Sequence, residues 1–152
     1  MSTTTTTSTA VDLTDADFDA KMNLASNKNL KKRTVILFYS PQCGHCVRFK
    51  PEYEALAERV FKGEMGDDVT IAKVDSSVNR DLMNRIHDPN FAAEREFNVM
   101  GVPTVVGYYN GKYYSTYAPG ETEEERKNFR TVKDLMDYIS GLGTAPIVYK
   151  EL

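Results

Sequence analysis

Residues 34–46 read T-V-I-L-F-Y-S-P-Q-C-G-H-C, and this stretch decides the fold. Its first six residues are rich in β-formers and apolar on both alternations, which predicts a strand buried on both faces of a helix-covered sheet. Cys43 and Cys46 follow directly, and they are the only 2 cysteines in the chain. From Val47 onward, apolar residues recur every three or four positions, which predicts a helix. The cysteines are therefore expected where a central strand passes into a helix.

Composition places the chain among globular domains. Its 152 residues are enough for one domain with a sizeable core, and the 41% hydrophobic and 27% charged shares are ordinary. A net charge of -3 gives no reason to expect nucleic acid or an anionic membrane as a partner. The longest apolar run falls short of the roughly 18 residues that a membrane span needs. We therefore expect a monomeric protein that binds neither nucleic acid nor membrane.

The rest of the chain predicts alternating helices and strands. Thr14 followed by Asp17 is a helix-start signal, so a first helix is expected through Phe18 and Met22, with an end near Asn27. A second strand is expected at 69–75, and an interrupted helical region at 76–98. A hairpin is expected at 102–117 around Asn110-Gly111, because this pair favours a type I′ turn. Thr131 opens the last helix, which ends at Gly141 and Gly143.

This order indicates an α/β domain with a central mixed sheet, flanking helices, and a C-terminal hairpin and helix. Residues 1–10 are nearly all Thr and Ser, and are expected to form a disordered tail. The domain itself is expected to span 11–143, followed by a C-terminal tail at 144–152.

The C-x-x-C spacing suits a reversible disulfide. A disulfide needs the two Cβ atoms about 3.8 Å apart, which positions i and i+3 at a helix start can satisfy, and the small Gly44 eases the turn. Cys43 would lie beside unpaired N–H groups at the positive end of the helix dipole, which favours its thiolate. Cys46 is expected to be more buried and to act as the resolving thiol. His45 can stabilise the reduced thiolate, which makes the disulfide a better oxidant.

The two cysteines allow two other interpretations. The cysteines could be half of a zinc site. Such a site needs four ligands in all, and besides the cysteines the sequence offers only His45, His87 and carboxylates. Two unrelated buried thiols would leave the strand-to-helix position unexplained. Redox chemistry is favoured, and no metal or cofactor is expected.

With these residues in view, the chain resembles the thioredoxin superfamily, and most of all the catalytic domains of protein disulfide isomerases. The motif C-G-H-C at 43–46 is the isomerase form of the active site. Its flanks F-Y-S-P at 38–41 and F-K-P-E-Y at 49–53 are similar, and G-V-P-T at 101–104 resembles a loop with a cis proline. The resemblance covers about residues 11–140 and implies a thioredoxin-like fold.

The resemblance also implies roles. Cys43 attacks substrate disulfides and Cys46 resolves the mixed disulfide. The backbone at Val102 and Pro103 pairs with an extended substrate segment, and Gln42 is counted with them as a substrate contact. Arg130 matches an arginine that swings toward the resolving cysteine. A surface arginine at a helix start is the alternative for Arg130, because about eight extra residues after Tyr117 blur the alignment.

Two departures from the family pattern stand close to the motif. Gln42 replaces a tryptophan, which removes an aromatic surface near the thiols. Leu37 replaces a buried carboxylate that accepts the proton of the resolving thiol, while Lys73 matches the lysine near that acid. Slower deprotonation of Cys46 is therefore expected.

The function expected is thiol–disulfide oxidoreductase activity on protein disulfides, biased toward oxidation or isomerisation. The partners would be protein or peptide substrates with disulfides or thiols, and a redox partner such as glutathione, a reductase or an oxidase. The alternatives are a cytosolic reductase of the thioredoxin kind, and a thioredoxin-fold binding or structural protein with weak catalysis. The first is motivated by the absence of a secretory signal, the second by Leu37 and Gln42.

The ends of the sequence suggest a cytoplasmic protein. The N-terminus lacks a basic region followed by an apolar one, and the final Y-K-E-L falls short of a K-D-E-L retention signal. An isomerase-type motif conflicts with this location, and a viral or processed origin is the alternative that would resolve the conflict.

Overall fold

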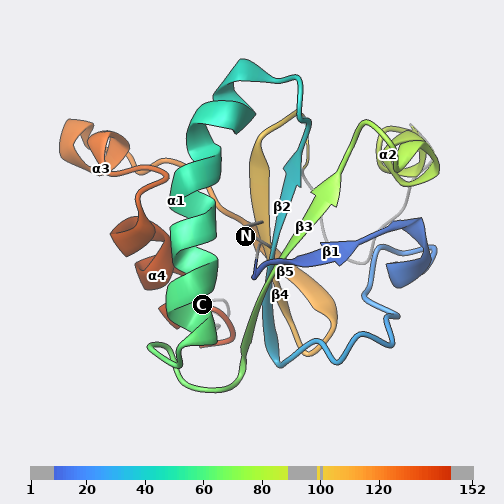
Figure 1. Cartoon of the computed structure of the whole chain (residues 1–152), viewed down its shortest axis with the longest axis horizontal. Helices are drawn as coiled ribbons and strands as arrows, with labels where there is room; N and C mark the ends of the chain where they lie inside the picture. Colours follow the sequence, from blue (N-terminus) through green and yellow to red (C-terminus); the bar gives the residue numbers. More distant parts are fainter. Residues whose placement is uncertain (1–8, 89–98, 100, 145–152) are drawn as a thin grey trace, which may run out of the picture.

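The computed structural model describes residues 9–88, 99 and 101–144. In this part of the chain, five strands form one sheet in the order β1-β3-β2-β4-β5 (Figure 1). The strands are β1 (Val11–Leu13), β2 (Arg33–Tyr39), β3 (Val69–Asp75), β4 (Thr104–Tyr109) and β5 (Lys112–Thr116). The helices are α1 (Gly44–Phe61), α2 (Arg80–Ile86), α3 (Glu123–Lys127) and α4 (Val132–Ser140), with one 3₁₀ turn, η1 (Asp15–Asp17).

The sheet is mixed, as predicted. β1, β3 and β2 run parallel to one another, whereas β4 is antiparallel to both β2 and β5. β2 and β3 occupy central positions, which explains why their sequences are apolar on both faces. β2 leads at its carboxyl end straight into the turn before α1, so the thiol motif lies at that edge of the sheet.

Helices cover both faces of the sheet. Leu37 and Phe38 are neighbours on β2, and their side chains enter different cores because strand side chains alternate. Leu37 packs in the cluster of Phe49 on α1 and Ile139 on α4, while Phe38 packs in the cluster of Leu82 on α2. Figure 1 shows α1 and α4 on one side of the sheet and α2 on the other. This packing fixes the start of α1 against the carboxyl end of β2.

The start of the domain differs from the prediction. Thr14 and Asp17 do form a capping box, but the helix is a single 3₁₀ turn and not a helix extending to Asn27. The preceding residues 11–13 form β1, paired with Ala72, Lys73 and Val74 of β3. Strand pairing with a segment 61 positions away leaves no local signal, so the local helix signal misled the prediction.

The C-terminal half follows the prediction closely. Asn110 and Gly111 have φ of 53° and 83°, the left-handed values that a type I′ turn requires. Thr131 caps α4, accepting a hydrogen bond from the backbone N–H of Asp134. α2 ends at Ile86, where an interruption was predicted, and the Glu-rich insertion forms α3. The remainder of the interrupted region and the two predicted tails fall largely outside the described residues.

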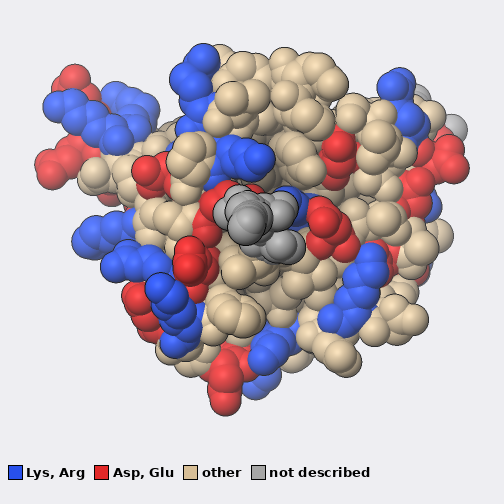
Figure 2. All heavy atoms as spheres, in the orientation of Figure 1, with Lys and Arg blue, Asp and Glu red and all other residues tan. Residues whose placement is uncertain are grey.

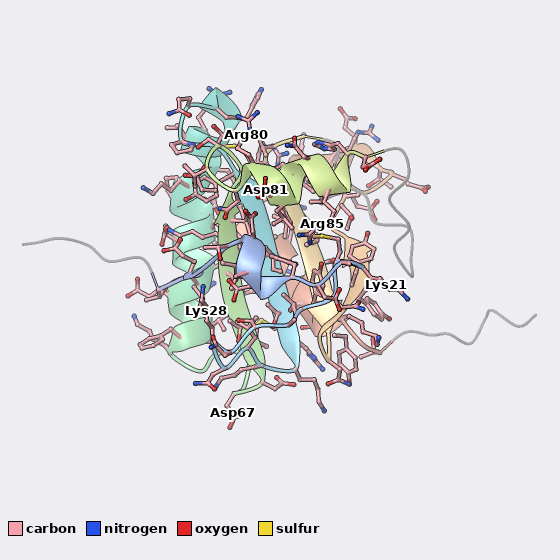
Figure 3. The ribbon with its side chains drawn as sticks, turned by 90° about the vertical axis from the view of Figure 1, so that its right-hand side faces the viewer. Lys21, Lys28, Asp67, Arg80, Asp81 and Arg85 are labelled. Atoms are coloured by element: carbon pink, nitrogen blue, oxygen red, sulfur yellow. The ribbon has the colours of Figure 1, made fainter. Side chains whose placement is uncertain are left out.

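The face formed by η1 and α2 carries charges of both signs. Figure 3 shows Arg80, Asp81 and Arg85 on α2, with Lys21 and Lys28 apart from them on the segment between η1 and β2. Lys28 Nζ lies 2.9 Å from Oδ2 of Asp17, whose side chain is only 5% exposed. This ion pair ties the segment to η1.

Candidate active site

Cys43 is the N-cap residue of α1. Its φ and ψ are -83° and 124°, outside the helical range, and its sulfur accepts a hydrogen bond from the backbone N–H of Cys46 at 3.4 Å. The thiol also points toward the loop before β4, with Sγ 3.8 Å from the carbonyl oxygen of Val102. The side chain is half-buried. Cys43 is thus reachable from solvent and surrounded by helix N-terminal donors.

Cys46 lies one turn further along α1 and is 5% exposed. The backbone N–H of Ser40, from the turn after β2, lies 3.5 Å from its sulfur. Both cysteines are present as free thiols. The predicted contrast between an accessible first thiol and a buried second one is what the structure contains.

The two thiols differ in acidity. The pKa of Cys43 is lowered, first by a hydrogen bond from the Cys46 thiol, then by the backbone N–H groups of Cys46 and His45, and also by the charge of Arg130. Burial first, and then the neighbouring Cys43, raise the pKa of Cys46 to about 11. Near neutral pH, Cys43 is therefore the thiol that more readily forms a thiolate, while Cys46 keeps its proton.

His45 and Gly44 lie between the thiols at the exposed start of α1. Nδ1 of His45 is 2.9 Å from Nη2 of Arg48. Because a guanidinium can only donate, the imidazole accepts in this contact. His45 reaches Cys43 through its backbone N–H. At Gly44, an added Cβ would meet only ordinary contact with Arg48, so the turn does not require glycine for space.

The loop before β4 faces the thiols. The peptide bond between Val102 and Pro103 is cis, as the family resemblance implies. Pro103 is buried, whereas Val102 is partly exposed and offers its carbonyl oxygen to Cys43. Gln42 is exposed in the turn before α1, where its backbone N–H donates to the Ser40 hydroxyl at 3.3 Å. Of these three residues, Val102 contacts the half-buried thiol, Pro103 follows it in the loop, and Gln42 precedes Cys43 in the chain.

Arg130 reaches the site from the turn before α4. Its Nη2 donates to the carbonyl oxygen of Pro103 at 3.2 Å, and its guanidinium lies 4.8 Å from the ring centre of Phe129 and 5.7 Å from that of Phe49. Its backbone N–H donates to the hydroxyl of Tyr117 at 2.7 Å. The structure thus brings Arg130 beside the cis-proline loop, despite the insertion after Tyr117.

Sequence reasoning did not identify the residues that anchor Arg130. The hydroxyl of Tyr117 donates to Oδ2 of Asp134 at 2.5 Å, and the Tyr117 ring stacks on Phe129 at 4.8 Å. Tyr117 and Asp134 lie on either side of the Glu-rich insertion. No local pattern predicts their contact, because α3 separates them along the chain.

A cavity of about 370 Å³ lies beside Cys46. Leu37, Glu54 and Lys73 are among its lining residues. Leu37 is 5% exposed and belongs to the core, so an apolar side chain occupies the position where the family resemblance implies a buried carboxylate. Glu54 also escaped the sequence reasoning, although its place eight residues after Cys46 puts both on one face of α1.

The described residues contain no group of three or more His, Cys, Asp and Glu side chains arranged to hold a metal ion. Within the same residues, none of the helices has the length and apolar character needed to cross a bilayer.

The mixed sheet, with a thiol pair where β2 turns into α1 and a cis-proline loop opposite, defines the class of thioredoxin-fold proteins. The chain belongs to the thioredoxin family, since the family model described as thioredoxin matches residues 9–132.

Among curated proteins, the chain is similar to protein disulfide isomerases. It is 34% identical over 106 residues to protein disulfide-isomerase A5 of Bos taurus, covering 70% of this chain and 17% of the relative. It is 36% identical over 110 residues to protein disulfide-isomerase A3 of Gallus gallus, covering 72% and 18%. The chain therefore spans less than a fifth of the length of these two relatives.

Solved structures agree on the fold. The first thioredoxin domain of mouse protein disulfide-isomerase A4 superposes with a TM-score of 0.56 at 23% identity, covering 94% of this chain and 84% of that one.

The comparisons correct one prediction. The A3 and A5 isomerases are proteins of the endoplasmic reticulum lumen, which contradicts the cytoplasmic location inferred from the sequence. That inference relied on the two ends of the sequence, and targeting segments are read separately from the fold. The cytoplasmic prediction is therefore wrong.

Proposed function

We propose that this chain is a thiol–disulfide oxidoreductase that acts on disulfides and thiols of proteins or peptides. The observation that carries the proposal is the asymmetry of the thiol pair. Cys43 combines access with a lowered pKa, whereas Cys46 is buried beside it with a pKa raised to about 11, chiefly by burial. An accessible thiolate can attack, and a buried thiol one turn away can resolve.

The reaction balances as two exchange steps. The Cys43 thiolate attacks one sulfur of a substrate disulfide, forming a mixed disulfide and releasing the other substrate sulfur as a thiolate. Cys46 then loses its proton and attacks Cys43 Sγ, forming the Cys43–Cys46 disulfide and releasing the second substrate thiolate. The substrate gains two electrons and the chain loses two. The reverse sequence oxidises a substrate dithiol.

The surface around the thiols suits a polypeptide substrate. Val47 and Val78 are 56% and 70% exposed, and the exposed Pro41 lines the same cavity as Val47. Figure 2 shows mostly uncharged atoms over the N-terminal end of α1, at the top of that view. In this proposal, the backbone at Val102 and Pro103 pairs with an extended substrate segment, Gln42 contacts it from the other side, and Arg130 approaches the resolving thiol.

The test is refolding of a protein with scrambled disulfides. The wild-type chain is expected to restore its activity, Cys43→Ser to lose this ability, and Cys46→Ser to accumulate mixed disulfides visible by non-reducing electrophoresis. Full activity of Cys43→Ser would contradict the mechanism.

Equilibration with glutathione buffers would then measure the reduction potential of the Cys43–Cys46 disulfide, which indicates whether the chain oxidises or reduces its substrates. A potential near about -180 mV supports oxidation and isomerisation with glutathione or an oxidase as partner, and one near about -270 mV supports reduction with a reductase.

A further inference from the structure

The resolving step has a requirement that the thiol pair alone does not meet. Cys46 must lose its proton before it can attack, and its pKa of about 11, raised by burial, keeps it protonated near neutral pH. A base within reach would remove this obstacle. The cavity beside Cys46 is the place to look for one, because it connects the buried thiol with other titratable side chains.

The cavity runs along one face of α1. Cys46 and Glu54 both line it, and their separation of eight positions corresponds to about two helical turns, or about 12 Å along the axis. Its volume of about 370 Å³ exceeds the roughly 30 Å³ that each water occupies in the liquid. A chain of several waters can therefore carry a proton over this distance.

Most lining groups cannot accept the proton. Leu37 is apolar, and the ammonium groups of Lys50 and Lys73 have no acceptor lone pair. Tyr53 donates its hydroxyl to the carbonyl oxygen of Ala72 at 2.7 Å, and burial raises its pKa well above the usual value.

Tyr39 is likewise a phenol near neutral pH, because burial and then the charges of Asp75, Asp12 and Glu54 raise its pKa. Among the described residues that line the cavity, Glu54 is the one carboxylate.

Lys73 positions this carboxylate. Its Nζ lies 3.7 Å from Oε2 of Glu54 and 3.9 Å from Oδ1 of Asp12, while its side chain is 16% exposed. Glu54 is 27% exposed, so it belongs to the cavity wall more than to the open surface. The charged and titratable groups around Glu54 include Lys73 from β3, Asp12 from β1, Tyr39 from β2, and Lys50 and Tyr53 from α1 itself.

We propose that Glu54, positioned by Lys73, accepts the proton of Cys46 through water in this cavity during resolution of the mixed disulfide. The inference rests on the proposed oxidoreductase function. The proton leaves the Cys46 thiol and ends on the Glu54 carboxylate, which becomes the neutral acid. The Cys46 thiolate then attacks Cys43 Sγ, the bond from Cys43 to the substrate breaks, and the substrate departs as a thiolate. In the reverse direction, Glu54 returns the proton to Cys46.

The test isolates the resolving step. Cys43 of the reduced protein is converted to a mixed disulfide with the chromophoric thiol nitrothiobenzoate, and release of that thiolate reports the attack by Cys46. Glu54→Gln is expected to slow release at least about tenfold near neutral pH, a threshold set below the roughly 10²–10⁴-fold that a general base typically contributes. Glu54→Asp is expected to recover part of the rate. Glu58→Gln is the matched control, because Glu58 is an exposed carboxylate on α1 paired with Lys62 away from the cavity.

The pH profile separates chemistry from structure. With a carboxylate base, the wild-type release rate is expected to level off across neutral pH. Without one, it rises about tenfold per pH unit toward the Cys46 pKa of about 11, and Glu54→Gln is expected to follow that profile. A wild-type release rate that rises about tenfold per pH unit would overturn the proposal even if the variant does not fold. Equal rates and profiles for wild type and Glu54→Gln would overturn the proposal.

The same release assay distinguishes failure of the proposed oxidoreductase function from failure of the role of Glu54. If the wild-type mixed disulfide releases no thiolate at any pH, Cys46 does not resolve it, which overturns both the oxidoreductase mechanism and the role of Glu54. Release that occurs normally but ignores Glu54 overturns the role of Glu54 alone.

Discussion

Leu37 and Lys73 are paired positions on the neighbouring parallel strands β2 and β3, and both line the cavity beside Cys46. The apolar side chain leaves Lys73 without a charged partner from β2, so its ammonium group turns to Glu54 on α1 and Asp12 on β1. The charged groups of the site therefore come from three elements, which are β3, α1 and β1.

Leu37→Glu is expected to place a carboxylate next to Lys73 and nearer to Cys46. Release of nitrothiobenzoate from Cys43 should become at least as fast as in the wild type, and in the Glu54→Gln background it should recover. The free energy of unfolding is expected to fall by about 2–5 kcal/mol, because a buried leucine leaves the core. Urea denaturation and the release assay measure the two effects.

The control for this substitution is Leu37→Gln, which has similar size but no charge. A rate gain that this variant also shows would mean that cavity hydration, and not the carboxylate, drives the change.

The two cysteines should differ in their alkylation as pH rises. Cys43 is expected to react with iodoacetamide at a lower pH than an ordinary cysteine, because its pKa is lowered, first by the Cys46 thiol and then by backbone donors. Cys46 is expected to stay largely unmodified until the pH approaches its burial-raised pKa of about 11. Mass spectrometry of peptides from protein alkylated across this pH range gives both profiles. Equal reactivity of the two thiols would contradict the assigned asymmetry.

Arg130 is expected to support the thiolate of Cys43 through its charge. Its φ of 72° lies in the left-handed region, where any residue with a Cβ is strained. Arg130→Gly therefore removes the side chain and relieves the backbone strain, whereas Arg130→Ala removes the side chain and keeps the strain. Both variants should raise the pH at which Cys43 becomes reactive by a similar amount. The glycine variant should differ from the alanine variant only in its free energy of unfolding. Arg130→Lys keeps the charge but loses the planar contact with Phe129. Unchanged alkylation profiles in all three would show that Arg130 does not act on the thiols.

Tyr117→Phe tests how Arg130 is anchored. The substitution removes the hydroxyl that accepts the Arg130 backbone N–H and donates to Asp134. The free energy of unfolding is expected to fall by about 1–3 kcal/mol, because partly buried polar groups lose their partner. Chemical denaturation measures this loss. Tyr109→Phe on β4 serves as the comparison, and an equal loss there would argue against a specific anchoring role.

The ion pair of Asp17 and Lys28 should make the free energy of unfolding depend on pH in the acidic range. Burial by itself raises the pKa of Asp17, but hydrogen bonds from Ser26, Lys28 and Thr14 outweigh it and leave the pKa below its ordinary value. A lowered carboxyl pKa stabilises the fold above the unfolded-state pKa, and this contribution disappears as the pH falls through the folded-state value.

Lys28→Met is therefore expected to lower stability at neutral pH, with a smaller difference from wild type below about pH 4. Thermal unfolding at several pH values measures it, and Lys21→Met provides an exposed lysine from the same segment as control. A difference that stays constant with pH would exclude the ion pair as its source.

The sequence by itself determined the parts of this protein that depend on local patterns. The apolar run at 34–39, the helical spacing after Cys46 and the Asn110-Gly111 turn each specify their element through contacts within a few residues. The cysteine spacing at a helix start likewise determined the unequal thiols, because helix N-terminal donors and one turn of burial are local properties.

The tertiary structure decided what lies around those thiols. β1 forms because residues 11–13 pair with β3, and Arg130 reaches Pro103 because Tyr117 holds its backbone across an insertion. Glu54 becomes a candidate base only once β3 brings Lys73 to α1 and leaves a cavity beneath Cys46. These contacts join segments far apart in the chain, and no periodicity or local propensity encodes a distance across a folded core.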